Sequence, residues 1–287
     1  MVSDSRSYDP QWLDLQYNNR ARIPEHPQIF RRWEQASELS REKSSRRLDV
    51  RYGSGPCETL DIFPSPRADA PVLVFIHGGY WRSLDKRDVS FIAPSFVQDD
   101  AMVVLPNYAL CPAVSIETIA LQMVDALAWT YRNAALYGGN PKRIVVAGHS
   151  AGGHLAAMML SCRWSSVAGD LPATLVRSAL SISGLYDLEP LRHTPFLKDD
   201  LRLTPAQVRK LSVALFPSPR GKLYAVVGAL ESEEFLRQNK LIRKAWGASA
   251  VPVCETIPGT NHLDVLHELA TPQGRLYTLA LELLGQT

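Results

Sequence analysis

The sequence predicts a single α/β domain, with a mostly parallel central sheet that carries helices on both faces. Seven short apolar runs, rich in β-branched residues, alternate with longer stretches of helical periodicity, as expected for successive β-α units. Several of these runs are apolar throughout, which is typical of strands covered on both faces. The whole chain, residues 1–287, is within the length range of one α/β domain and is long enough to bury a continuous core.

The expected elements follow one another in a regular order. Strands are predicted at Leu60–Phe63, Val72–Ile76, Met102–Leu105, Ile144–Ala147, Ala179–Ile182, Leu223–Val227 and Val253–Ile257. Helices are predicted at about 86–97, 115–136, 151–162, 234–246 and 272–284. The stretch from about 187 to 219 contains prolines, charges and short apolar pieces, and it is too long for a plain loop in a compact domain. We interpret it as a small helical cap inserted between two strands.

Residues 1–50 differ from the rest and are expected to form an N-terminal helical extension. Between residues 11 and 45, many charges are interspersed with large apolar side chains: Trp12, Leu15, Tyr17, Ile29, Phe30, Trp33 and Leu39. This pattern indicates one or two amphipathic helices, broken around Pro24 and Pro27. Because the aromatic residues need a surface to cover, we expect the extension to pack on the main domain and to help roof its site.

The composition is that of an ordinary soluble globular protein. Hydrophobic residues make up 46% of the chain, charged residues 21%, and the formal net charge is +2, which is too balanced to indicate nucleic-acid binding. No apolar run reaches the ~18 residues that suggest a membrane span, and the polar first residues do not resemble a secretory signal. The cysteines lie far apart, without metal-ligand spacing, at Cys57, Cys111, Cys162 and Cys254, so that reduced thiols and a cytoplasmic location are expected.

The strongest chemical signal is the motif GHSAG at 148–152, which follows a predicted strand and opens a predicted helix. This is the context of a nucleophile elbow, in which a strained strand-to-helix turn presents a serine. The flanking Gly148 and Gly152 avoid steric clashes in such a turn. The start of the following helix directs free N–H groups at the reacting centre. Ser150 is therefore the predicted nucleophile of an α/β-hydrolase fold.

A second motif, HGGYW at 77–81, follows the predicted strand Val72–Ile76. Acyl transfer passes through an oxyanion, which needs backbone N–H donors that are already in position. Glycines allow the main chain to approach closely, so we expect Gly78 and Gly79 to supply donors, with a further one from Ala151. Tyr80 and Trp81 follow this loop, and they either border an aromatic leaving group or, in the case of Trp81, belong to the core.

The general base is expected to be His262. In this fold the chain order is nucleophile, acid, histidine, and His262 lies in a loop just after the last predicted strand. His154 lies on the helix of the elbow, His193 lies in the predicted cap, and His267 is better explained as a helix residue.

Two loop carboxylates compete for the role of the acid. Glu231 follows the strand Leu223–Val227, and Asp187 follows the strand before it. The usual layout of the fold favours Glu231, since it comes from the later strand. Asp187 would then cap the first helix of the cap. Glu233 and Glu234 begin a helix and are expected to be solvated.

Six stretches carry a resemblance to a known family. They are YNNRAR at 17–22, HGGYW at 77–81, GHSAGGH at 148–154, SGLYDLEPL at 183–191, GALESEEFLRQ at 228–238 and GTNHLDVL at 259–266. In these motifs the chain resembles the kynurenine formamidases (arylformamidases) of the α/β-hydrolase superfamily. The HGG and GxSxG motifs are shared with hormone-sensitive-lipase-like esterases, whereas HGGYW and the stretch around Glu231 are more specific.

The resemblance implies a serine hydrolase with Ser150, Glu231 and His262 as its triad and N-formyl-L-kynurenine, an intermediate of tryptophan breakdown, as its substrate. Glu231 stands where animal members carry an aspartate, which keeps the carboxylate and lengthens the side chain by one methylene. Because members of this type also cleave small aryl and acyl esters, a general short-chain carboxylesterase is the alternative.

The same reading implies a small-molecule partner, either a formamide or an ester. No metal or other cofactor is expected, because the histidines lack metal-ligand spacing. The oligomeric state, a homodimer included, is left open by the sequence.

Overall fold

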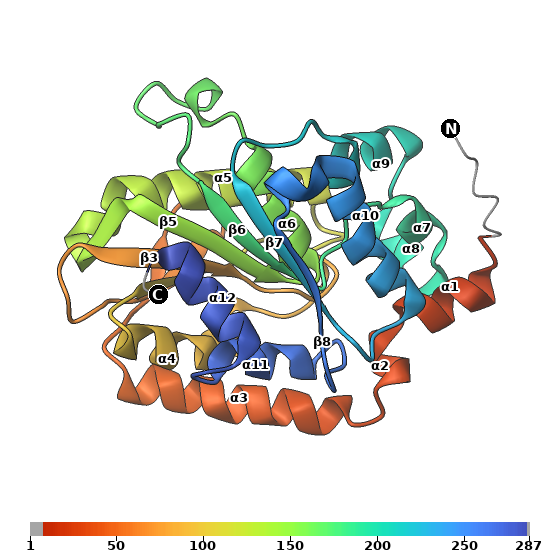
Figure 1. The fold of residues 1–287 in the computed structure, drawn as a ribbon, viewed down its shortest axis with the longest axis horizontal. Coiled ribbons are helices and arrows are strands. Elements are labelled where there is room, and N and C mark those ends of the chain that lie inside the picture. The colour runs from red at the N-terminus through yellow and green to blue at the C-terminus, as the bar shows by residue number, and fades with distance from the viewer. Residues whose placement is uncertain (1–7, 286–287) are drawn as a thin grey trace.

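The computed structural model describes residues 8–285, and within them eight strands form one sheet in the order β1-β2-β4-β3-β5-β6-β7-β8 (Figure 1). β2 pairs antiparallel with β1 and β4, whereas the strands from β4 to β8 along this order pair in parallel. The strands are β1 (Arg47–Arg51), β2 (Thr59–Phe63), β3 (Ala70–Ile76), β4 (Met102–Pro106), β5 (Gly139–His149), β6 (Ser178–Ile182), β7 (Lys222–Gly228) and β8 (Val253–Ile257).

The seven predicted strands are all confirmed, and β1 is the one that the sequence pattern missed. Its sequence, RLDVR, alternates between exposed and half-buried residues at the edge of the sheet, so it lacks the apolar run that marks the others. β3 and β4, in contrast, are buried at every position. Val72 and Val74 belong to the core on one face of the sheet, and Leu73 and Phe75 to the core on the other, as the two-residue period of a strand requires.

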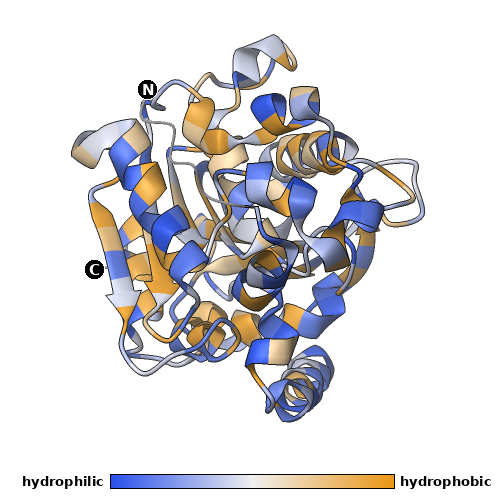
Figure 2. Ribbon diagram, turned by 90° about the vertical axis from the view of Figure 1, so that its right-hand side faces the viewer, coloured by the Kyte–Doolittle hydropathy of each residue, from blue (hydrophilic) through white to orange (hydrophobic). Residues whose placement is uncertain are grey.

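Helices cover both faces of the sheet. One core includes residues of α5 (Ile116–Asn133), α6 (Ala151–Ser161) and α10 (Glu233–Ala250), and the other includes residues of η1 (Lys86–Ile92), α4 (Ala93–Gln98), α11 (His267–Ala270) and α12 (Arg275–Leu284). Figure 2 shows hydrophilic and hydrophobic stretches alternating along the helices, because each helix buries only one side. The described residues also contain four short 3₁₀ helices: η2 (Ala134–Tyr137), η3 (Trp164–Ser166), η4 (Val213–Leu215) and η5 (Asp264–Leu266). Within the part of the chain that the structure describes, no helix is both long and apolar enough to cross a lipid bilayer.

The N-terminal segment forms α1 (Pro10–Tyr17), α2 (Asn19–Arg22) and α3 (His26–Lys43), which run along one edge of the domain (Figure 1). Asp9 begins α1 by accepting the N–H groups of Gln11 and Trp12, as an N-cap aspartate does. Leu13 and Tyr17 of α1 are buried in one core, while α3 buries residues in the other. The segment therefore packs on both layers of the domain.

The stretch from 187 to 219 lies between β6 and β7. It contains α7 (Glu189–His193), α8 (Pro195–Leu201), α9 (Pro205–Leu211) and the turn η4. A proline stands in the first turn of each of these three helices, where its missing N–H costs no hydrogen bond. The helix α1 contacts both α7 and α8, so the N-terminal segment and this insertion meet at the end of the sheet where the parallel strands terminate.

Candidate active site

Ser150 stands at the junction of β5 and α6 in a strained conformation, with φ 56° and ψ −116°. Its N–H donates to the carbonyl of Ile182 on the neighbouring strand at 2.8 Å. A Cβ on Gly148 would lie 2.2 Å from the carbonyl oxygen of Gly152, and one on Gly152 would lie 2.0 Å from that of Ile76. The two glycines are therefore required by the close approach of the main chain, and the geometry is that of a nucleophile elbow.

His262 and Glu231 form a buried hydrogen-bonded pair. His262 Nδ1 lies 2.6 Å from Glu231 Oε2, and the two residues are 5% and 7% exposed. Glu231 Oε1 also accepts the hydroxyl of Ser183 at 2.5 Å and the N–H of Gly228 at 2.7 Å. Because the carboxylate only accepts, Nδ1 carries the proton, and the lone pair of His262 is left on Nε2.

Two further side chains hold His262 in place. His149 Nε2 donates to the main-chain carbonyl of His262 at 2.7 Å, and the two imidazole rings lie 4.6 Å apart. The ring of Phe235 lies 4.4 Å from that of His262. Burial and the neighbouring His262 lower the pKa of His149 well below its usual value, so His149 is a neutral support at physiological pH.

The loop after β3 brings Gly78 and Gly79 next to Ser150. A Cβ on Gly78 would lie 2.8 Å from the carbonyl oxygen of His149 and 3.3 Å from the Cβ of Ser150. Gly79 has a φ of 96°, and a Cβ there would lie 2.1 Å from the carbonyl oxygen of Ser83. Both positions therefore exclude any larger residue. At Gly78 the reason is lack of space, and at Gly79 it is both lack of space and the positive φ angle.

Tyr108 fixes the orientation of this loop, and sequence reasoning did not identify it. Its hydroxyl donates to the carbonyl oxygens of His77 and Gly78 at 2.9 and 3.1 Å, and its ring stacks on that of His77 at 4.1 Å. In a planar trans peptide the N–H points away from the carbonyl. By holding these two carbonyls, Tyr108 therefore also sets the direction of the N–H groups of Gly78 and Gly79. Ala151, the first residue of α6, has an N–H without an intrahelical partner.

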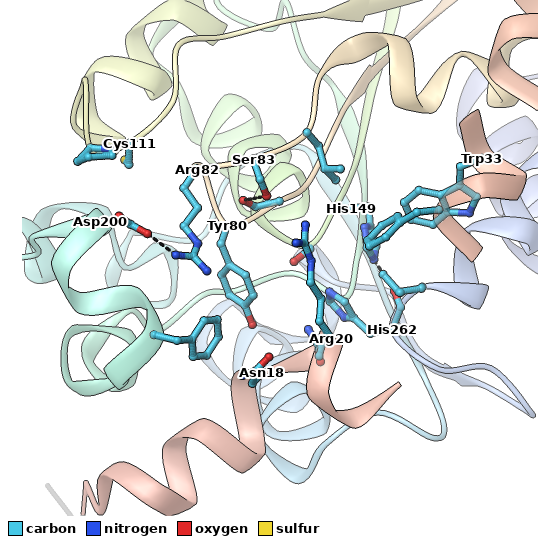
Figure 3. Close-up of a pocket in the computed structure, with 18 residues that line it drawn as sticks. Asn18, Arg20, Trp33, Tyr80, Arg82, Ser83, Cys111, His149, Asp200 and His262 are labelled. Carbon is cyan, nitrogen blue, oxygen red and sulfur yellow. Dashed lines mark hydrogen bonds and ion pairs between the residues drawn. The ribbon is translucent and has the colours of Figure 1, made fainter. Parts of the chain in front are cut away.

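A cavity of about 330 Å³ opens beside Ser150 and His262 (Figure 3). The N-terminal segment supplies one of its walls. The other lining residues come from the loop after β3, from the loop after β4, from the elbow between β5 and α6, from α8 and from the loop that contains His262. The lining residues are Asn18, Asn19, Arg20, Phe30, Trp33, Gly79, Tyr80, Arg82, Ser83, Leu84, Cys111, Pro112, His149, Ser150, Phe196, Asp200, His262 and Leu263.

Of the two aromatic residues after the glycine loop, only Tyr80 lines this cavity. Its hydroxyl donates to the carbonyl of Tyr17 at 2.7 Å. Trp81 is fully buried and makes an edge-on contact with His154, at 5.1 Å between the ring centroids. Tyr80 and Trp81 both have positive φ, 51° and 56°, and this turn sends their side chains in different directions. Of the two alternatives for Trp81, a place in the core agrees with the structure, and a place beside the substrate does not.

The remaining candidates have other partners. Asp187 pairs with Arg237 at 3.2 Å and accepts the N–H of Glu189, at the start of α7, at 3.2 Å. Buried His154 bonds to the carbonyl of Leu211. His193, on α7, bonds to Glu189 at 3.0 Å, and His267 begins α11. Within residues 8–285, no three His, Cys, Asp or Glu side chains are grouped as a metal site.

Glu234 was expected in solvent but is only 2% exposed. It accepts the hydroxyl of Tyr17 at 2.7 Å and pairs with Arg237 at 2.8 Å. The reason is tertiary: α1 packs across the start of α10 and covers it. No local pattern in the sequence signals this contact, since Tyr17 and Glu234 are 217 positions apart.

Comparison with known proteins identifies relatives along the whole chain. Residues 60–175 match the BD-FAE family. A kynurenine formamidase of Danio rerio is 28% identical over 100% of both chains. The esterase LipC of Mycobacterium tuberculosis is 33% identical over 52% of this chain and 39% of its own length. The crystal structure of a candidate thioesterase from Silicibacter sp. TM1040 superposes with a TM-score of 0.80, at 30% identity, covering 93% of this chain and 97% of the other.

The superposition on this solved structure agrees with the observed fold. The predicted fold is thus confirmed, and so is the resemblance on which the family expectation was based. The chain belongs to the α/β-hydrolase superfamily, and within it is similar to the kynurenine formamidases over its whole length.

Proposed function

We propose that this chain is a serine hydrolase that cleaves an aryl formamide of the N-formyl-L-kynurenine type, or a small aryl ester, through an acyl-enzyme. The observation that carries the proposal is the buried His262–Glu231 pair, at 2.6 Å, because His262 of this pair lines the same cavity as the strained Ser150. A histidine oriented by a carboxylate beside a serine in an elbow is the arrangement that nucleophilic catalysis requires. The similarity to kynurenine formamidases supports the formamide.

In the first half of the reaction, the Ser150 hydroxyl attacks the formyl carbon while His262 Nε2 accepts its proton. Glu231 stabilises the imidazolium that forms, and its bonds to Ser183 and Gly228 keep it from turning away. The tetrahedral oxyanion is bound by the N–H groups of the glycine loop and of Ala151, each of which contributes about 3 kcal/mol to lowering the barrier. His262 then protonates the leaving amine, and the C–N bond breaks.

In the second half, water replaces the amine. His262 removes a proton from the water, which attacks the formyl-enzyme, and the same oxyanion donors bind the second intermediate. Collapse of this intermediate returns the proton to Ser150 and releases formate, so the enzyme ends in its starting state.

The walls of the cavity suit an aromatic leaving group. Phe30, Trp33, Tyr80 and Phe196 all line it, and the ring of Tyr80 meets that of Phe196 edge-on at 5.9 Å. A cavity of about 330 Å³ is at the small end of ligand sites and fits a single substituted ring. The proposed substrate belongs to tryptophan breakdown. We propose that the reaction takes place in the cytoplasm, since the four cysteines are unpaired thiols.

The test is turnover of N-formyl-L-kynurenine beside p-nitrophenyl acetate and butyrate, with Ser150→Ala as the control. We expect kcat/KM for the formamide to exceed that for both esters by orders of magnitude, and the Ser150→Ala protein to lose all three activities. Turnover that persists in the Ser150→Ala protein would contradict the assignment of the nucleophile.

A general short-chain carboxylesterase is the second candidate. The similarity to the esterase LipC over half of this chain favours it. Rapid turnover of both esters, without turnover of N-formyl-L-kynurenine, would replace the first proposal by this one.

A further inference from the structure

Two hydrogen-bond donors of the N-terminal segment have no protein partner at the cavity. The side-chain nitrogen of Asn19 is buried without a hydrogen bond, in a residue that is 7% exposed. Among the described residues, the neighbouring Arg20 pairs with no carboxylate. Its guanidinium lies over the ring of Phe30 instead, 5.2 Å from the ring centroid. A buried donor left unpaired is costly, and in a native protein it calls for an explanation.

Both residues lie where a ligand would contact them. Asn19 and Arg20 line the cavity that contains Ser150 and His262, and Asn19 also lines a second, adjoining cavity that reaches Glu231 and His262. Figure 3 shows Arg20 reaching from α2 into the space between Tyr80 and His149. The two donors thus come from one short stretch of chain at the entrance to the proposed catalytic site.

The charges around the cavity are unbalanced at this point. Arg82 is the other arginine among the described residues that line it, and it is paired with Asp200, the one carboxylate among those residues. The charges of Arg82 and Asp200 neutralise each other, whereas the positive charge of Arg20 is not neutralised by a carboxylate. The wall formed by the N-terminal segment therefore presents a guanidinium without an ion pair and an amide donor without a hydrogen bond, which is the chemistry that recognises a carboxylate.

We propose that Asn19 and Arg20 form an anion subsite, which binds a carboxylate carried by the leaving group of the substrate. The proposal rests on the function proposed above for this cavity. The carboxylate must belong to the leaving group, because the formyl group consists of the reacting carbonyl carbon alone and cannot carry a carboxylate. The subsite selects aryl formamides or aryl esters that carry an acid over neutral analogues, and it satisfies the Asn19 donor when the substrate binds.

The experiment compares matched substrates that differ only in this charge. One pair is N-formyl-L-kynurenine and its carboxamide, and the other is 3-acetoxybenzoate and 3-acetoxybenzamide. The variants are Arg20→Gln, Arg20→Lys and Asn19→Leu. The control is Arg31→Gln, which removes the same charge from an exposed position on α3 outside the cavity.

We expect the wild-type enzyme to prefer the acid of each pair that it cleaves. Arg20→Gln should lower kcat/KM for the acid about tenfold, mainly through KM, as expected for the loss of a charge-assisted hydrogen bond. The neutral partner should change less than about twofold, and Arg31→Gln should leave both unchanged. Arg20→Lys should keep part of the preference, because it keeps the charge. Asn19→Leu should weaken binding of the acid without lowering Tm, since it removes a donor that has no partner in the free protein.

The outcomes separate this proposal from the one on which it rests. If only the esters are cleaved, and Arg20→Gln removes a preference for the benzoate, the subsite is supported and the formamide substrate is not. If N-formyl-L-kynurenine is cleaved but its carboxamide is cleaved equally well, with or without Arg20, the formamidase stands and the subsite is refuted. An equal loss on the acid and on the amide in Arg20→Gln also refutes it, because this indicates a purely structural role.

Discussion

The substitution Glu231→Gln gives the most direct test of the proposed triad, because the structure fixes how the new side chain must sit. In the wild type, Oε1 accepts the Gly228 N–H and the Ser183 hydroxyl, and Oε2 accepts His262 Nδ1–H. Glutamine keeps the shape but has one oxygen and one NH₂ group. If the NH₂ group faced Gly228, two donors would meet in a buried site, at a cost of about 1–3 kcal/mol. The amide oxygen therefore stays on Gly228, and the NH₂ group faces His262.

This orientation forces the wrong tautomer on His262. A donor opposite Nδ1 requires a lone pair there, so the proton moves to Nε2. The Nε2 atom then has no lone pair with which to accept the proton of Ser150. A base in the wrong tautomer lowers kcat of a triad hydrolase by about 10⁴-fold, which corresponds to about 5.5 kcal/mol of barrier. KM should change little, since Glu231 does not line the main cavity.

The assay is steady-state kinetics on the best substrate, with thermal unfolding to show that the variant is folded. The matched control is Asp187→Asn, which removes the other candidate acid. Its partly exposed ion pair with Arg237 contributes at most about 1 kcal/mol, so kcat should be nearly unchanged. A loss of less than tenfold in Glu231→Gln, or a large loss in Asp187→Asn, would refute the reasoning.

Three further predictions concern the glycine loop, the N-terminal segment and the buried histidines. Gly78→Ala places a methyl group 2.8 Å from a backbone oxygen. It should lower kcat about 10²- to 10³-fold by displacing an oxyanion donor. An unchanged kcat in steady-state kinetics would contradict this prediction. Tyr17→Phe removes the hydroxyl bonded to the buried Glu234 and should lower the free energy of unfolding by about 1–3 kcal/mol, which urea titration measures. Burial lowers the pKa of His77 and of His154 to about 4. The unfolded chain therefore binds more protons between pH 4 and about 6.5, so stability is complete above that range and is lost on acidification, by about 2 kcal/mol per imidazole at pH 5. Urea midpoints that do not fall between pH 7.5 and 5, or a slope that His154→Gln fails to reduce, would count against this account.

Much of the fold could be predicted from the sequence, because the patterns that determine it are local. A strand buried on both faces needs a continuous apolar run, and the parallel strands of this sheet provide one. The elbow could be predicted for a similar reason, since a turn in which a Cβ on Gly148 would lie 2.2 Å from a carbonyl oxygen admits nothing larger than glycine. His262 and Glu231 were identified from their place after successive strands, which the topology brings to one edge.

The features that could not be predicted from the sequence depend on contacts between segments that are far apart in the chain. Tyr108 orients the glycine loop from the end of β4, 30 positions away from Gly78. The sequence could not decide between the core and the cavity for Trp81, because the answer depends on the two consecutive positive φ angles at Tyr80 and Trp81. Neither residue is of a type that usually adopts that conformation. β1 was missed because an edge strand with one exposed side has no apolar run.

The position of α1 to α3 means that substrate contact and bond cleavage draw on different parts of the chain. The residues proposed for bond cleavage all lie after residue 76, whereas Asn18, Asn19, Arg20, Phe30 and Trp33 come from the first 33 positions. The molecule is thus organised as a reaction centre and an N-terminal front segment, which is joined to it by the Tyr17 contacts to Tyr80 and Glu234 and by the residues of α1 and α3 that are buried in the two cores. Substitution of the lining residues of this segment should therefore change which molecules are accepted, while the residues proposed for bond cleavage stay in place.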